Sequence, residues 1–572
     1  MSGDAAGPCA TALPCTGGRK FVASLTLLFA GLLFLRDPVR LLNPQFWAED
    51  GSVFFHQAYD DGFWRALIEP TAGYLNFFPR LVAGLARPFP FLATPLIYDL
   101  AAFALQVAPI AYLLSGRIGR YLPNRRVRVV AALLYVAAPN TYETYVTLTN
   151  SQWNLALLAL LLLLIEPPAS RWGRVGESLV LGIFSLTGPL GVILLPAVAW
   201  SSYLDRATPR RRWSLAQVLI LGCGAAVQLV FLTTTPRTTP GLDQGAPLAL
   251  QEVVQILSTH AVLDSLLGIK GTIWASRHLG MAGYLAGLAL AVFLAGYALH
   301  RRQRALLQLL WLAVATIALS FVFPLAPLRG WLRPDFGPRY YLYVTFFLIY
   351  AILLLCTQAG WRRWLGATLA LPLLAVGIPG DFHYPHRPDT QWPAQVAAFE
   401  SRQQGAAFYI PLQPQGYGGV SVRKRTPGQA ASPLNGLRPA AGTPHYELSR
   451  PEIGGSVAWG NIDFLIFSGW AVDTPNRETA GGVWVVVDGM VFPAVFGRER
   501  PQVASLLGDQ RYSVSGFIRH IPLSEIGLGR HRVSLVVLTH DRAGSYTVSG
   551  YDFVVRHAGE YFAVDIISPY AR

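Results

Sequence analysis

The sequence predicts a polytopic α-helical membrane protein followed by a C-terminal all-β sandwich domain. Three observations lead to this fold class. Of the 572 residues, 52% are hydrophobic and only 14% are charged. The mean hydropathy of +0.38 is too high for a soluble chain of this length. Apolar runs recur from residue 21 to residue 378, and a period-two alternation of apolar residues follows from about residue 455.

Apolar runs that cross a bilayer, or nearly do, are expected at 21–36, 94–115, 127–139, 152–165, 177–203, 214–232, 281–299, 305–324, 339–357 and 361–378. The run 177–203 has arginine clusters at both ends and Gly188-Pro189 in its middle. We therefore expect a hairpin of two short segments there, which gives about eleven spans in all. The first run follows Arg19 and Lys20 without a cleavage site after it, so we expect it to be retained.

The charge of +14 does not indicate nucleic-acid binding, because the basic residues lie in short clusters between the apolar runs. The positive-inside rule puts these clusters and the tail 1–20 in the cytoplasm, and everything after residue 378 outside. Only three of the 46 basic residues are lysines, as in GC-rich bacterial genomes, so we expect a bacterial inner (cell) membrane. None of the four cysteines lies in the polar C-terminal third, which excludes a disulfide framework there.

This topology places four loops outside, at 37–93, 140–151, 233–280 and 325–338. The multi-span domain is expected to cover 21–378. Residues 379–454 are rich in Pro, Gly and Gln and are expected to form an exported linker with little regular structure. In the domain 455–572, "GGVWVVVDG" alternates Val483, Val485 and Val487 with Trp484 and ends in an Asp488-Gly489 hairpin turn. Trp470 and Trp484 are either sugar-stacking or, as is commoner, core residues.

Two adjacent carboxylates, Glu49 and Asp50, open the first outer loop in "WAEDGSVFF". They belong either to a solvated loop or to an active site. Their neighbours Phe46, Trp47, Phe54 and Phe55 are expected at the lipid headgroup level, and "GYLNFFPRL" is typical of an amphipathic interfacial segment. A partly desolvated carboxylate in such a loop is suited to general-base catalysis.

Arginines in "LRGWLRPDFGPRYY" indicate a phosphate site, because the guanidinium fork makes bidentate contacts with phosphate. Snorkelling toward lipid headgroups is the alternative, and Asp335 could pair with one of these arginines. The phosphate candidates, in order of preference, are Arg339, Arg333 and Arg80, with Arg87 and Arg329 behind them. Asn150 and Gln152 in "TLTNSQWN" offer amide donors for sugar hydroxyls, although a helix N-cap explains part of that pattern. The substrate-binding set predicted here is Tyr74, Asn150, Gln152 and Tyr340.

His56, Asp60 and Asp61 could form a divalent-cation site (Mg or Mn) with Glu49 or Asp50. Their spacing matches no defined ligand loop, so a solvated helix end is favoured and no metal ligands are assigned. The sequence also contains no phosphate-cradling glycine loop, Ser-His-Asp arrangement or nucleotide fingerprint.

A first span, an outer loop that opens with "WAEDGSVF", a multi-span core and an outer-face "GPRYY" resemble the glycosyltransferase C (GT-C) superfamily over about residues 20–380. The resemblance implies an inverting transfer from a polyprenyl-phosphate sugar to an envelope glycan, lipid or protein. It maps the catalytic base to Glu49 or Asp50 and the donor-phosphate contact to Arg339, then Arg333. Many members have Asp-Asp or Asp-Glu at the acidic pair. The C-terminal stretch is similar to β-sandwich modules of bacterial envelope proteins.

Two other functions are compatible with a chain of this kind. A transporter or flippase of lipid-linked glycans would place charges in mid-span, and the predicted spans are almost free of them. A non-catalytic anchor that displays the sandwich would tolerate the loss of Glu49 and Asp50, and it leaves the large multi-span core unexplained.

Overall fold

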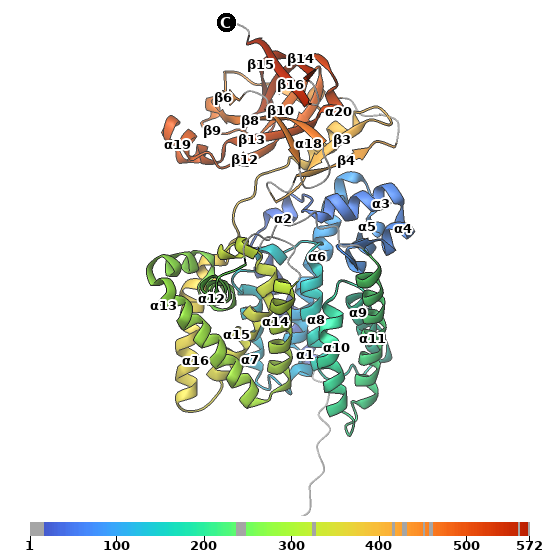
Figure 1. Cartoon of the computed structure of the whole chain (residues 1–572), viewed down its shortest axis with the longest axis vertical. Coiled ribbons are helices and arrows are strands. Elements are labelled where there is room, and N and C mark those ends of the chain that lie inside the picture. Colours follow the sequence, from blue (N-terminus) through green and yellow to red (C-terminus); the bar gives the residue numbers. More distant parts are fainter. Residues whose placement is uncertain are drawn as a thin grey trace, which may run out of the picture.

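The computed structural model describes residues 16–235, 247–322, 328–414, 418–425, 432–449, 452–456, 462–558 and 561–569. Most of the tail 1–20, with Cys9 and Cys15, lies outside these residues, as do parts of the loops 233–280 and 325–338. A helical bundle carries a β-rich C-terminal part on one end (Figure 1). Its main helices are α1 (Thr16–Phe34), α6 (Thr94–Leu114), α7 (Arg125–Ala137), α8 (Ser151–Leu164), α9 (Arg171–Ser185), α10 (Leu190–Leu204), α11 (Arg211–Thr234), α12 (Leu250–Ser258), α13 (Asp264–Arg301), α14 (Arg304–Val322), α15 (Leu342–Cys356) and α16 (Trp361–Pro372).

Six helical segments of the described chain are long and apolar enough to cross a membrane: Phe91–Leu114, Arg211–Thr234, Leu250–Arg301, Arg304–Val322, Pro338–Cys356 and Trp361–Asp381. The expectation of about eleven spans is therefore wrong. Helices α7, α8 and α10 have 13, 14 and 15 residues. At ~1.5 Å per residue they are shorter than the hydrocarbon core. The length of an apolar run in the sequence does not determine how long the helix is or whether it meets lipid. Helix α8, for example, is buried among other helices along most of its length.

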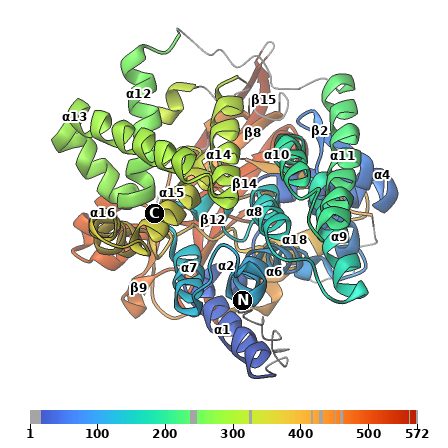
Figure 2. The same cartoon turned by 90° about the horizontal axis from the view of Figure 1, so that it is seen from below.

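The expected break in the run 177–203 is confirmed, because α9 ends at Ser185 and α10 begins at Leu190. Gly188 has a φ of +78°, which an L side chain rarely adopts. Its N–H donates to the carbonyl of Leu75 at 2.8 Å, so the turn packs against the first outer loop. Viewed from below, α9, α10 and α11 group on one side of the bundle, and α12, α13 and α16 on the other (Figure 2).

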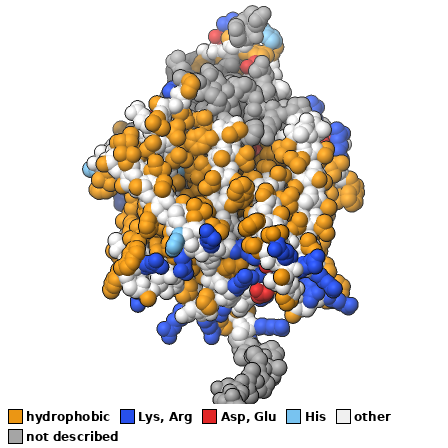
Figure 3. All heavy atoms as spheres, turned by 60° about the horizontal axis from the view of Figure 1, so that its bottom comes forward, with side chains coloured by type: hydrophobic (Ala, Val, Ile, Leu, Met, Phe, Trp, Pro, Cys, Tyr) orange, Lys and Arg blue, Asp and Glu red, His pale blue; other side chains and the backbone are white. Residues whose placement is uncertain are grey.

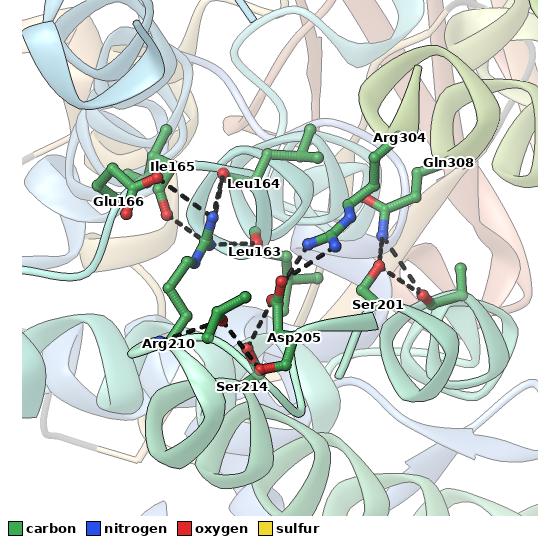
Figure 4. A network of polar contacts seen from close by, with 12 residues as sticks. Leu163, Leu164, Ile165, Glu166, Ser201, Asp205, Arg210, Ser214, Arg304 and Gln308 are labelled. Atoms are coloured by element: carbon green, nitrogen blue, oxygen red, sulfur yellow. Dashed lines mark hydrogen bonds and ion pairs between the residues drawn. The ribbon is translucent and has the colours of Figure 1, made fainter. Parts of the chain in front are cut away.

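Polar side chains tie the helices together near the turn that joins α10 to α11 (Figure 4), at the end of the bundle away from the β-rich part (Figure 1). Arg210 caps the end of α8 by donating to the carbonyls of Leu163, Leu164 and Ile165, the last at 2.9 Å. Asp205 pairs with Arg304 at 3.0 Å and accepts from Ser214 at 2.9 Å. Lys and Arg side chains gather near this end, beyond the band of hydrophobic side chains (Figure 3).

The first outer loop is folded over most of its length. It contains α2 (Val39–Leu42), a π-helical turn at Asp50–Phe55, α3 (His56–Asp61), α4 (Phe63–Ile68), the two-stranded hairpin β1 (Pro70–Thr71) and β2 (Tyr74–Leu75), and α5 (Phe77–Ala86). Gln228 of α11 anchors the hairpin, because its amide accepts from the N–H of Leu75 at 3.0 Å and donates to its carbonyl at 2.9 Å.

The C-terminal part contains two packed sheets, as expected, which are antiparallel except that β5 pairs with β15 in parallel. The first has the order β11-β10-β14-β15-β16, with β5 beside β15, and the second β12-β13-β8-β6, with β7 and β9 also on β8. The strands are β5 (Arg438–Pro439), β6 (His445–Leu448), β7 (Glu452–Ser456), β8 (Ile462–Asp473), β9 (Glu478–Thr479), β10 (Gly482–Val487), β11 (Met490–Pro493), β12 (Val495–Arg498), β13 (Gly516–Pro522), β14 (Gly529–Leu538), β15 (Gly544–Ala558) and β16 (Tyr561–Pro569), with α19 (Pro501–Leu507) and α20 (Leu523–Ile526) between them.

The expected alternation on β10 is confirmed. Val483, Val485 and Val487 lie in the core between the sheets, and Trp484 points to the other face. There Trp484 is buried and donates from its indole to Gln391 at 3.0 Å, so it is a core residue. Asp488 and Gly489 both have positive φ and join β10 to β11 as a two-residue turn.

The expectation that 379–454 has little regular structure is wrong. Besides β5, β6 and part of β7, the described part of this segment contains α18 (Trp392–Glu400) and the hairpin β3 (Ala407–Pro411) and β4 (Gly419–Arg423). Polar and turn residues are frequent in this segment, but its few apolar residues pack either against the first outer loop or against the sheet that contains β10. Phe399, Phe408 and Ile410 join a core with the first outer loop.

Candidate functional site

A cavity of about 510 Å³ lies between the first outer loop and the helices α8, α10, α11 and α14. Its polar lining includes Glu49, Tyr74, Glu143, Asn150, Gln152, Arg339 and Tyr340, and its apolar lining includes Leu190, Val192, Ile193, Leu232 and Leu319. A smaller cavity of about 110 Å³, between α6, α7, α8, α14 and α15, has no charged residue in its lining. The larger cavity therefore combines carboxylate and guanidinium groups, which an active site needs, with an apolar flank.

The structure separates the roles of the two adjacent carboxylates. Glu49 lines the cavity, where one carboxylate oxygen accepts from the hydroxyl of Thr149 at 3.1 Å. Asp50 is 2% exposed and is absent from the cavity lining. Its carboxylate accepts from the backbone N–H groups of Leu148 at 3.2 Å and Thr149 at 2.6 Å. Asp50 thus holds the 147–150 loop, and Glu49 is the carboxylate that a substrate can reach.

Burial raises the pKa of Asp50 to about 8, because desolvation outweighs the two N–H bonds to the carboxylate. The guanidinium of Arg40 is close enough to lower that pKa but does not reverse the shift. Arg40 is itself buried and lies 4.5 Å from the centre of the Trp47 ring. This arrangement suits a structural carboxyl that stays protonated near neutral pH.

Arg339 reaches the cavity from the short helix Pro338–Tyr341, directly before α15. Its guanidinium pairs with the carboxylate of Glu143, and its backbone N–H donates to the same carboxylate at 3.2 Å. Glu143 was missed by the sequence analysis. It is the only carboxylate in the sequence of the outer loop 140–151, and that signal could have found it.

Buried residues of the 252–345 region hold the short helix that carries Arg339. His260 contacts the carbonyl of Trp331 at 2.7 Å and the carboxylate of Asp264 at 2.9 Å. The ring of Tyr341 stacks on the imidazole with centroids 4.6 Å apart. Trp331 lies against Tyr340 at 5.4 Å, so the cavity residues Arg339 and Tyr340 rest on a packed layer.

All four predicted substrate-binding residues line this cavity. Tyr74 has Gln152 as its side-chain hydrogen-bonding neighbour. Asn150 precedes α8 but makes no side-chain cap, and its amide donates instead to the carbonyl of Glu143 at 2.8 Å. A helix N-cap by Asn150 therefore does not account for the "TLTNSQWN" pattern.

The two other predicted phosphate ligands lie away from the cavity lining. Arg333 is largely exposed and pairs with Asp335 at 2.7 Å. Arg80 is 1% exposed and donates to the carbonyl of Ala66 and the hydroxyl of Thr71, both at 2.5 Å. Arg80 is a structural residue of the first outer loop, because α5 turns it inward where the sequence pattern alone placed it at the headgroup level.

The aromatic residues beside the acidic pair do not lie at an exposed headgroup surface as expected. Phe46, Trp47, Phe54 and Phe55 are all buried, and three of them share a core with Phe399, Phe408 and Leu412. The exposed apolar residues of this loop include Trp64 and Ile68 on α4 instead. Residues of α18 and of the β3–β4 hairpin, far away in the sequence, thus cover the aromatic residues that were expected to meet lipid.

The proposed cation ligands do not converge. His56 pairs with Asp60 at 2.8 Å. No group of three or more His, Cys, Asp or Glu side chains that could hold a metal occurs among the residues that the structure describes.

The fold and the cavity define a membrane protein with several apolar helices that could cross a membrane, a β-sandwich-like C-terminal part and a polar cavity against the outer loop. The chain matches no protein-family model, and no curated protein is significantly similar to it in sequence.

Proposed function

We propose that the protein is an inverting glycosyltransferase that moves a sugar from a polyprenyl-phosphate donor to an envelope glycan, lipid or protein. The observation that carries the proposal is a single cavity whose lining holds a reachable carboxylate, Glu49, a guanidinium, Arg339, and an apolar flank from α10, α11 and α14. A lipid-linked sugar needs all three, because its prenyl chain is apolar, its phosphate is anionic and its acceptor must lose a proton.

In the proposed step, an acceptor hydroxyl oxygen bonds to the anomeric carbon as the bond from that carbon to the phosphate oxygen breaks. The hydroxyl proton goes to Glu49, and polyprenyl phosphate leaves with the bonding electrons. Arg339 is the cation that meets the leaving phosphate, and Glu143 orients it. Tyr74, Asn150, Gln152 and Tyr340 supply hydroxyl and amide groups for the sugar.

The proposed setting is a bacterial inner membrane with the cavity at its outer face. The arginine-rich helix ends lie away from the β-rich part (Figure 3), and the positive-inside rule assigns them to the cytoplasm. The N-terminus is then cytoplasmic and the β-rich part is outside. In this orientation the prenyl chain of a donor stays in the bilayer while its sugar reaches Glu49.

Transport of a lipid-linked glycan is the second candidate, and one observation favours it. The described spans contain buried ionisable side chains that sequence reasoning underestimated, namely Asp99 on α6 and the pair His260–Asp264. Buried charges within spans are typical of ion-coupled transport. His260, however, contacts Trp331 and Tyr341, which pack beside Arg339 and Tyr340, and Asp264 pairs with His260. Both residues therefore have a structural role within the transferase as well.

The test compares the lipid-linked and envelope glycans of cells that make the wild type, Glu49→Gln or no protein, by mass spectrometry at matched membrane levels. The amide oxygen introduced by Glu49→Gln can still accept from Thr149, so the fold is expected to survive. We expect the Glu49→Gln cells to lose one sugar and to accumulate the unmodified acceptor, with a fall of ~10²–10⁴-fold in transfer rate. The exposed residue Glu499 gives the matched control, Glu499→Gln.

Unchanged glycans in both the variant and the deletion would refute the transferase. A glycan that is complete but trapped on the inner face in deletion cells would favour transport instead.

A further inference from the structure

Three residues that directly follow β3, Leu412, Gln413 and Pro414 (the hairpin tip), reach from the C-terminal part into the first outer loop. Gln413 donates from its N–H to the carbonyl of Phe46 at 3.0 Å, and its carbonyl accepts from the N–H of Ala48. Its backbone bridges to Trp47 in the parallel sense. Pro414 lines the cavity together with Trp47, Ala48 and Glu49. The hairpin tip therefore adds one more extended segment to the backbone that carries the candidate base.

Side-chain packing fixes the hairpin tip in this place. Leu412 is 3% exposed and belongs to the core that includes Phe46, Val53 and Phe54. A Cβ added to Gly51 would lie 3.2 Å from one methyl carbon of Leu412 and still closer to the other, so a side chain at position 51 would require Leu412 to shift. The contact is as closely packed as a protein interior.

The sandwich holds the other end of the same hairpin. Arg519 on β13, 1% exposed, donates to the carbonyl of Tyr409 at 2.7 Å, and the N–H of Tyr409 donates to Glu525 at 2.7 Å. Arg519 also donates to Gln395 of α18 at 3.1 Å. Burial lowers the pKa of Arg519 to about 10 and raises that of Glu525 to about 7. The sandwich thus holds β3 at Tyr409, and the chain that leaves β3 contacts the backbone beside Glu49 through Gln413.

The position of the hairpin tip determines which substrate it meets. Glu49 takes the proton of the acceptor, so the surface next to Glu49 faces the acceptor, and Arg339 marks the donor phosphate on the Glu143 side. In an inverting transfer the acceptor and the leaving phosphate are on opposite faces of the anomeric carbon. The Trp47 ring is not a free stacking platform, because the guanidiniums of Arg40 and Arg387 lie over it at 4.5 and 4.4 Å. Among the described residues of the C-terminal part, Pro414 is the one that reaches the cavity lining here.

We infer that the hairpin tip forms the acceptor-side wall of the cavity, so that the C-terminal β-rich part takes part in selecting the acceptor hydroxyl. The inference rests on the proposed transferase activity. It assigns Pro414 as a specificity-determining contact, and it assigns Leu412 and Gln413 as the residues that position it. The β-rich part is then a component of the active site in addition to any separate binding role.

The experiment uses membranes containing the full-length protein, a short-chain polyprenyl-phosphate sugar that the wild type consumes, and the acceptor identified by the glycan comparison. Pro414→Trp enlarges the wall and Pro414→Gly reduces it. Gln403→Trp, at an exposed position of the same segment, is the matched control. Initial rates are measured against donor and acceptor concentration separately.

We expect Pro414→Trp to raise the KM for the acceptor at least tenfold and the KM for the donor less than threefold. Pro414→Gly is expected to shift the preference between acceptors of different size. Consumption of donor by both variants shows that they are folded. An acceptor KM equal to that of Gln403→Trp in both variants would overturn the inference, and so would a rise confined to the donor KM. If the wild type consumes no donor of this class, the proposed transferase itself fails.

Discussion

Asp50→Asn is expected to destabilise the fold, because Asp50 anchors the 147–150 loop through two buried N–H groups. An asparagine has a single acceptor oxygen, so one of these N–H groups is left facing an amide NH2. A buried donor without a partner costs ~1–3 kcal/mol. We therefore expect the free energy of unfolding to fall by that amount at pH 5, while Glu49 remains in the cavity and transfer continues in the folded fraction.

The pH dependence distinguishes this role from catalysis. With a pKa of about 8 in the folded protein and about 4 in the unfolded chain, Asp50 takes up a proton on folding between these pH values. The folded state binds more protons there, so this contribution to stability falls as the pH rises from about 4 to about 8. Asparagine removes the contribution. Because this loss is about 1.4 kcal/mol per pH unit, the stability advantage of the wild type over Asp50→Asn is expected to be largest at pH 5 and to disappear or reverse by pH 8.

Thermal unfolding of the detergent-solubilised protein at pH 5, 6, 7 and 8 measures this difference, and the glycan comparison measures transfer. The matched variant is Glu49→Gln, which should leave the unfolding profile close to wild type and lower the transfer rate ~10²–10⁴-fold. The assignment would be falsified if Asp50→Asn unfolds like the wild type and loses transfer while Glu49→Gln retains it.

Two further changes test the donor site and the β-rich part. Arg339→Lys replaces a forked guanidinium by a point charge and should raise the KM for the donor by ~10–100-fold, as expected for the loss of a charge-assisted hydrogen bond of ~1.5–3 kcal/mol. Arg333→Lys, at an exposed residue paired with Asp335, should stay within about twofold in the same donor titration. Gly489 has a φ of +81° in the turn between β10 and β11, so Gly489→Val should lower the unfolding free energy by ~1–2 kcal/mol, and Gly489→Asn by less, in denaturant titrations.

Local patterns of the sequence predicted the elements whose neighbours are close in the chain. Gly188-Pro189 marks the break between α9 and α10, because the turn needs a positive φ that glycine allows. The period-two run at Val483–Val487 becomes β10, since its two faces meet different cores. The predicted cavity residues Tyr74, Asn150, Gln152, Arg339 and Tyr340 are likewise in one lining. Each lies in an outer loop or at its junction with a helix, where a polar side chain between apolar runs is a strong local signal.

What the sequence did not predict depends on contacts between distant segments. No neighbouring residue in the sequence distinguishes the role of Glu49 from that of Asp50. Their roles differ because the N–H groups of Leu148 and Thr149 donate to the Asp50 carboxylate. The aromatic residues around the pair look like headgroup anchors until the β3–β4 hairpin covers them, about 350 residues later in the chain. The hairpin was itself hidden in a Pro- and Gly-rich segment whose composition is typical of a linker.

The covered outer face of β10 has a practical consequence for dividing the chain. Trp484, Val486, Val536 and Leu538 form an apolar strip on the side of the sheet away from the sandwich core, and Ala394, Leu434 and Leu437 cover it. A fragment that starts at residue 455 would expose this strip to water and leave the indole of Trp484 without Gln391. A fragment that begins before α18, near residue 387, keeps this cover on the strip, and it carries the β3–β4 hairpin with it.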